Sequence, residues 1–185
     1  MTRIPRKELG LFALLAVLCL IVAWQEPRFV SPTNIQNMLR LIGLYGVFSL
    51  GAAFVIITGG IDLSVGSMLA LLGVLFSVAL TSWGLGPVAA VAFILLLAAA
   101  MGAAHGYLVS RIRLQPFIVT LCGLLIYRGL ARFIAQDEAK GFGDSKGFEP
   151  LKELATGSML GIPTPFLFMV ILSVVLGLVL HRTVY

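Results

Sequence analysis

The chain has 185 residues, of which 59% are hydrophobic and 11% are charged, and its formal net charge is +5. Soluble domains usually carry about 25% charged residues, so this composition excludes an ordinary soluble domain and indicates a polytopic membrane protein. We expect an all-α fold, a transmembrane helical bundle that forms one domain over residues 1–185. The positive charge does not indicate nucleic-acid binding, because no basic run is interleaved with aromatic residues.

Six apolar segments approach the ~20 residues that cross a bilayer as a helix. They cover residues 9–24, 39–58, 63–80, 88–109, 117–134 and 165–180. The first follows a basic start, as in a signal peptide, but it ends in AWQEP without a small-x-small cleavage site, so we expect an uncleaved helix. Before the second segment, Thr33 or Asn34 is predicted to cap a short helix.

The loops between these segments predict the orientation of the chain. With the N-terminus in the cytoplasm, six crossings leave the mixed-charge loop 135–163 outside. The basic residues that then share the cytoplasmic side are Arg3, Arg6, Lys7, Arg111, Arg113 and Arg182. This distribution follows the positive-inside rule and favours a multi-pass protein with a cytoplasmic N-terminus.

The stretch TGGIDLSVGS, residues 58–67, interrupts two apolar runs with a glycine pair and a carboxylate. One interpretation is local: Gly59 and Gly60 end a helix in the left-handed conformation, and Asp62 caps the next helix by accepting from the amides of Ser64 or Val65. The other is functional, since an irregular turn at membrane depth is buried in protein or lines a path, and broken helices expose backbone groups to solutes in many transporters. Spacing favours capping and leaves both open.

The sequence contains no HExxH, GxSxG or P-loop pattern, so we expect no catalytic residue, no metal site and no enzyme activity. Ser64 or Ser67 as the nucleophile of an intramembrane hydrolase is a weaker alternative, since neither histidine lies at a helical spacing from them. Cys19 and Cys122 lie in apolar segments without CxxC spacing and are interpreted as small reduced core residues.

Gly102 and Gly106 stand four residues apart among alanines. This pattern predicts a face for close packing between helices. His105, beside them, is interpreted as an interfacial or helix-bonded histidine rather than a proton relay.

TGGIDLSVGSMLALLGV closely resembles the signature region of the permease subunits of bacterial ABC importers for ribose, arabinose, xylose and related simple sugars. FVSPTNIQNMLR resembles the family's preceding external stretch, and RIRLQPFIVTLCGLLIYRGLA resembles its inner basic loop and next helix. The matching residues of the signature are Gly59, Gly60, Asp62, Ser64 and Gly66. The resemblance covers essentially the whole chain.

There are two departures from the family pattern. Family members are much longer, so we interpret the chain as an N-terminal portion that lacks the C-terminal helices and the ATPase-docking loop. His105-Gly106 also stands where the family often has Asn-Gly.

The resemblance implies a division of labour in the bacterial inner membrane. A periplasmic sugar-binding protein delivers solute, two permease subunits in a homodimer or heterodimer form the path, and ABC ATPase subunits drive alternating access. ATP is then used by the partner subunits, and this chain binds no cofactor. Gly59, Gly60, Asp62, Ser64 and Gly66 would shape a helix break beside the path.

Four arginines near the segment ends have two interpretations. Headgroup anchoring is the plainer one. Under the resemblance, Arg128 and Arg132 are candidates for contact with the binding protein, and Arg111 and Arg113 for contact with the ATPase. The remaining alternative for the whole chain is an ion- or proton-coupled secondary transporter in which Asp62 binds the coupling ion at the break.

Overall fold

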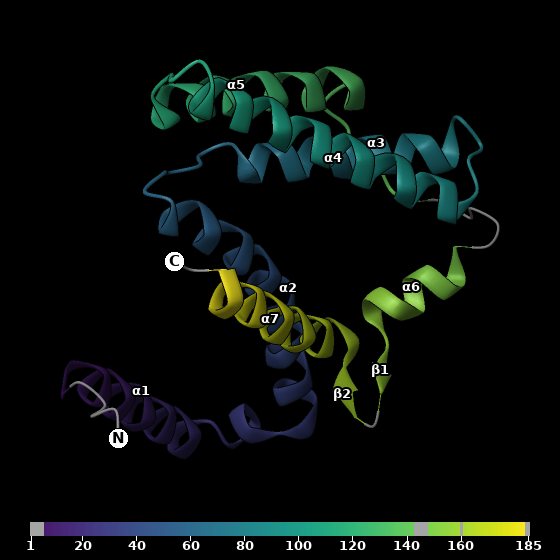
Figure 1. The fold of residues 1–185 in the computed structure, drawn as a ribbon. Helices are drawn as coiled ribbons and strands as arrows, with labels where there is room; N and C mark the ends of the chain where they lie inside the picture. Colours follow the sequence, from purple (N-terminus) through teal and green to yellow (C-terminus); the bar gives the residue numbers. More distant parts are fainter. Residues whose placement is uncertain (1–5, 143–147, 160, 184–185) are drawn as a thin grey trace. The chain divides into compact units, whose positions relative to one another are not determined.

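The computed structural model describes residues 6–142, 148–159 and 161–183, which form two compact units. The first unit combines Met1–Gly46 with Ser158–Tyr185, and the second is Val47–Gly157. Figure 1 labels their elements along the chain. The first unit holds α1 (Arg6–Gln25), the 3₁₀ turn η1 (Pro27–Val30), the start of α2 (Pro32–Ile57), β1 (Ser158–Met159), β2 (Ile162–Pro163) and α7 (Thr164–Thr183).

In the first unit, α2 and α7 pack closely at a glycine. A Cβ at Gly43 would overlap the backbone of Pro165 and Phe166, so this crossing requires a residue without a side chain. At Gly46, about one turn further on, a Cβ would lie 2.7 Å from Cγ of Met169. These two glycines allow the start of α7 to approach the α2 backbone.

The connection into α2 differs from the predicted short helix. The helix is continuous from Pro32, and its cap is Ser31, whose Oγ accepts from the Asn34 amide at 3.3 Å. Proline suits the first helical position because it has no amide that needs a partner there. Asn34 instead donates its side-chain amide to the Phe29 carbonyl at 2.7 Å, so the prediction of Thr33 or Asn34 as the cap was wrong.

The second unit contains the end of α2, α3 (Val65–Thr81), α4 (Pro87–Ser110), α5 (Pro116–Ala135) and α6 (Glu149–Thr156). In Figure 1, α3, α4 and α5 lie side by side, and α3 contacts both of the others. One core cluster joins them through Leu71, Leu72, Met101 and Ala131. A second, smaller cluster joins α3 and α4 through Ala79, Leu80 and Ala90.

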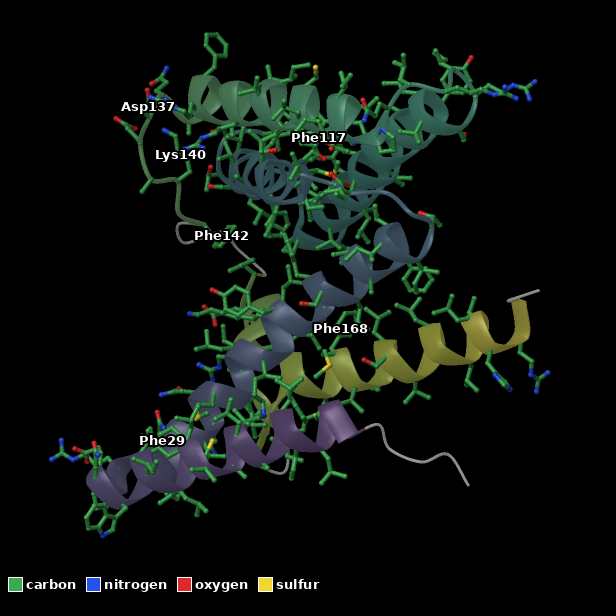
Figure 2. All side chains as sticks on the ribbon, turned by 90° about the vertical axis from the view of Figure 1, so that its left-hand side faces the viewer. Phe29, Phe117, Asp137, Lys140, Phe142 and Phe168 are labelled. Atoms are coloured by element: carbon green, nitrogen blue, oxygen red, sulfur yellow. The ribbon has the colours of Figure 1, made fainter. Side chains whose placement is uncertain are left out.

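The loop predicted over 135–163 contains structure that the sequence analysis did not anticipate. It includes α6 and the hairpin of β1 and β2. The segment before α6 packs on α3, because the rings of Phe142 and Phe148 lie 5.5 and 6.3 Å from the ring of Phe76. Ser77 also donates a hydrogen bond to the Gly141 carbonyl. Figure 2 shows Phe142 on this segment, beyond Asp137 and Lys140.

The structure confirms an all-α fold with membrane-like helices. Among the described residues, α2, α4, α5 and α7 are long and apolar enough to cross a bilayer, whereas Leu9–Gln25 and Val65–Thr81 are apolar but shorter. Large apolar side chains stand exposed on these helices, such as Leu96 on α4 and Ile171 on α7. Such surfaces suit contact with lipid or with further helices.

Candidate functional site at the break between α2 and α3

The end of α2 is closed by a Schellman motif centred on Gly59. Its φ of 78° is left-handed. The Gly59 amide donates to the Ile56 carbonyl at 2.9 Å, and the Gly60 amide donates to the Val55 carbonyl at 3.0 Å. These two bonds satisfy helix-end carbonyls that would otherwise lack partners. The prediction that the glycine pair ends the helix is confirmed, with Gly59 as the left-handed residue.

Gly60 is constrained by space rather than by a left-handed backbone. A Cβ there would lie 3.2 Å from Cγ1 of Val55 and 3.9 Å from Cβ of Pro116 in α5. The Thr120 hydroxyl, one turn into α5, is 3.3 Å from the Ile61 carbonyl and 2.9 Å from the Pro116 carbonyl. The non-helical backbone of the break therefore rests on the first turns of α5.

Asp62 positions Ser64, at the start of α3, through two hydrogen bonds. Its Oδ1 accepts from the Ser64 amide at 2.8 Å and from the Ser64 hydroxyl at 2.6 Å. Ser64 is the N-cap residue of α3, and its carbonyl accepts from the Met68 amide at 2.8 Å. The predicted bond from the Ser64 amide to Asp62 is confirmed, although Asp62 lies two residues before the cap.

A histidine and a tyrosine from two other helices extend this arrangement. Nδ1 of His105 in α4 is 3.4 Å from the Ser64 hydroxyl, and its Nε2 is 3.0 Å from the Tyr127 hydroxyl of α5. The imidazole and the phenol ring are stacked with centroids 5.5 Å apart. We call Asp62, Ser64, His105 and Tyr127 the break network, because they connect the break to both α4 and α5.

The break network borders a cavity between α4 and α5. His105 and Tyr127 line this space of about 260 Å³ together with Cys122 and mostly aliphatic side chains. Cys122 is exposed and Cys19 is half-buried, and both thiols are free. The interpretation as a core residue was therefore wrong for Cys122, whereas Cys19 is partly buried, and the reduced state expected for both agrees with their free thiols.

The approach of Ser64 to His105 raises the question of a catalytic serine. A nucleophilic serine must give its proton to the base and must be open to substrate. Here the Ser64 hydroxyl lies closest to the Asp62 carboxylate, and Ser64 is 0% exposed. This geometry suits a structural hydrogen-bonded chain and does not support Ser64 as a nucleophile. The other candidate, Ser67, donates its hydroxyl to the Ser64 carbonyl at 2.7 Å. No group of three or more potential metal ligands occurs among the residues searched, which are those with described positions.

The predicted packing glycines do not meet another helix within the described ranges. A Cβ at Gly102 or Gly106 would find no atom of those residues within 4 Å, and the same holds for Gly66. The packing role of Gly102 and Gly106 stays a prediction. The close contact between α4 and α5 instead uses a glycine of α5, because the His105 ring of α4 lies against Gly123.

The four candidate partner-facing arginines lie on or just after α4 and α5 and are not members of the break network. Arg111 is the C-cap residue of α4, and Arg113 adopts a left-handed φ of 62° in the following loop. Arg128 is exposed on α5. Arg132 donates from Nε to Asp137 at 2.6 Å, an exposed ion pair at the end of α5. Their contacts with partner proteins remain predictions.

Sequence reasoning missed the roles of His105, Gly123 and Tyr127. The available signal was the spacing of Gly123 and Tyr127, which are one turn apart and therefore share a face of α5. Nothing in the spacing indicated that this face meets His105 of α4.

Comparison with known proteins gives matches over most of the chain. The family model described as branched-chain amino acid transport system / permease component matches residues 34–185. The ribose import permease protein RbsC of Bacillus subtilis is 37% identical to this chain, covering 96% of the chain and 54% of its own length. The fructose import permease protein FruF of Bifidobacterium longum is 35% identical, covering 93% and 50%.

A third relative gives a similar coverage. The L-arabinose ABC transporter permease protein AraH of Azospirillum brasilense is 32% identical, covering 95% of this chain and 50% of its own length. The chain thus spans about half the length of the curated relatives that it matches. No solved structure matches it.

Proposed function

The chain belongs to the branched-chain amino acid transport system / permease component family, and from this premise we propose that it forms part of the translocation path of an ATP-driven importer for a simple sugar. The observation that carries the choice of substrate is the similarity to ribose, fructose and arabinose permeases over nearly the whole chain. Under this proposal the solute is a sugar, despite the amino acid in the family's description.

The proposal includes partners and a location. ATPase subunits bind and hydrolyse the nucleotide, a periplasmic sugar-binding protein delivers the solute, and a second permease subunit completes the path. This chain lies in the bacterial inner membrane with its N-terminus in the cytoplasm and holds no cofactor of its own. Its apolar helices α2, α4, α5 and α7 support the membrane location by length and composition.

The break between α2 and α3 is proposed to shape the path. In a transporter, non-helical backbone at membrane depth is stable only where protein or water satisfies its polar groups. Here Ser64 donates twice to Asp62, and Thr120 lies against the Ile61 carbonyl. We assign Asp62 to holding the break, because Oδ1 of its carboxylate is already bonded within the chain.

Uptake into proteoliposomes tests this function. The full-length permease is reconstituted with its ATPase subunits and binding protein, and uptake of labelled ribose, arabinose, fructose and leucine is followed with ATP inside or outside the vesicles. We expect uptake of one of the sugars that requires ATP on the ATPase side and survives ionophores. Uptake driven by an ion gradient without ATPase subunits would overturn the proposal in favour of a secondary transporter, and uptake of leucine alone would overturn the substrate.

A further inference from the structure

The hydrogen-bond donors of the break network determine which nitrogen of His105 carries a proton. A serine hydroxyl has one proton to donate and two lone pairs. The Ser64 hydroxyl lies 2.6 Å from Oδ1 of Asp62, and the same oxygen accepts from the Ser64 amide at 2.8 Å, so the serine proton goes to this accepting oxygen. Toward His105 the Ser64 oxygen then offers a lone pair, and Nδ1 of His105 must supply the proton of that contact.

The proton on Nδ1 also determines the role of Nε2 in the same ring. A neutral imidazole has one N–H and one accepting nitrogen. With the proton on Nδ1, Nε2 accepts from the Tyr127 hydroxyl at 3.0 Å. Every bond of the break network then points the same way, from Tyr127 through His105 and Ser64 to Asp62.

The surroundings of His105 hold its ring in one orientation. A Cβ at Gly123 would lie 2.7 Å from both Cε1 and Nε2 of the imidazole, so the ring lies directly on the α5 backbone. One turn later the Tyr127 ring stacks on it with an interplanar angle of 25°. A ring fixed in this way presents Nδ1 to α3 and Nε2 to α5.

We propose that His105 is a positioning residue for transport, held as the Nδ1–H tautomer, which fixes the helix break to α4 and α5. The inference rests on the proposed import function and adds a residue to its machinery. Without the imidazole, the fully buried Ser64 and the Tyr127 hydroxyl each lose a partner. The Ser64 hydroxyl keeps its bond to Asp62, but the polar link from the break to α4 is lost and the half-buried Tyr127 hydroxyl has no acceptor on α4. An unpaired, partly buried hydroxyl is costly, so we expect the break to move relative to α4 and α5.

The tautomer is tested without measuring transport. The full-length permease, assembled with its partners in nanodiscs, is labelled with ¹⁵N in the imidazole rings, and the His105 signals are assigned by their loss in His105→Gln. We expect a protonated Nδ1 and an unprotonated, accepting Nε2 in the wild type. Ser64→Ala removes the acceptor and should shift the signals toward the Nε2–H form. An Nε2–H tautomer in the wild type would overturn the assignment, and so would His105 ¹⁵N signals that do not change in Ser64→Ala.

Uptake per inserted molecule tests the positioning role. An Asn side chain places an amide N–H near the position of Nδ1, so His105→Asn keeps the bond to Ser64, whereas His105→Leu removes it. We expect uptake to fall about tenfold in His105→Leu and by no more than about twofold in His105→Asn. Tyr127→Phe should reduce uptake, and Tyr107→Phe, which alters an exposed tyrosine on α4, is its matched control.

The outcomes separate the two proposals. No ATP-driven sugar uptake by the wild type would overturn the proposed function. Wild-type uptake together with equal rates for His105→Leu and His105→Asn would overturn the positioning role. A residue needed only for folding would lower the amount of inserted protein in His105→Leu and leave uptake per molecule unchanged, which also contradicts the proposal.

Discussion

The imidazole of His105 lies against Gly123, so close that a methyl group on this glycine would be 2.7 Å from two ring atoms. The two residues come from α4 and α5. Their contact places the ring beside Ser64, at the start of α3. Both α4 and α5 thus meet the break between α2 and α3 through one side chain.

Gly123→Ala is expected to displace the His105 ring and lower the thermal midpoint of the purified permease. Inserting a methyl group into packed structure typically costs about 1–3 kcal/mol, which exceeds the gain of up to ~1 kcal/mol from replacing a helical glycine by alanine. Gly129→Ala on the same helix is the control, because its Cβ would find no described atom within 4 Å. A thermal midpoint equal to that of Gly129→Ala would contradict the close contact.

Asp62→Ala is expected to destabilise the permease more than Asp62→Asn. Alanine removes both bonds from Ser64, whereas asparagine keeps an accepting oxygen for the amide and loses the charge. We expect about 2 kcal/mol for alanine and about 1 kcal/mol for asparagine in the free energy of unfolding. Glu153→Ala, an exposed carboxylate on α6, should be neutral. Equal losses for the two Asp62 variants would argue against the paired bonds.

The chain illustrates which features local sequence can predict. The Schellman motif at Gly59 and the bond from Ser64 to Asp62 depend on neighbours in sequence, and both followed from residue type and spacing. The contact of Ser64 with His105 joins residues 41 positions apart. It depends on how α3 and α4 pack, and an apolar helix carries little periodic signal to indicate which face turns inward, because lipid accepts apolar side chains on every side.

The same distinction applies to the connections between helices. In the predicted loop 135–163, the segment before α6 is held on α3, because Phe142 and Phe148 lie against Phe76. The residues themselves show no pattern that identifies this partner. The start of α2 was missed for a local reason. The cap was predicted at Thr33 or Asn34, after Pro32, although proline is favoured in the first turn of a helix and Pro32 begins α2.

Arg132→Gln is expected to raise the pKa of Asp137 toward its ordinary value. In the wild type, the hydrogen bond from Arg132 holds the pKa of the Asp137 carboxyl below that value. A lowered pKa in the folded state gives stability that is present above the unfolded pKa and is lost as pH falls through the folded pKa. Because both side chains are exposed, solvent screening keeps this contribution small, and the thermal midpoint at pH 7 should not change.

A ¹³C carboxyl titration of Asp137 by NMR measures this shift. Arg128→Gln, one turn earlier on the same helix, is the matched control and should leave the pKa of Asp137 as it is in the wild type. If the Asp137 carboxyl has the same pKa in Arg132→Gln as in the wild type, the ion pair is not formed in solution.

Two substitutions at Gly59 test whether the break between α2 and α3 takes part in transport. Its φ of 78° is open to asparagine but strongly disfavoured for a β-branched residue. The measurement is ATP-driven sugar uptake per inserted permease in proteoliposomes. We expect at least about half of wild-type uptake for Gly59→Asn and less than about a tenth for Gly59→Val, with both variants inserted. Equal uptake per inserted molecule in the two variants would contradict it.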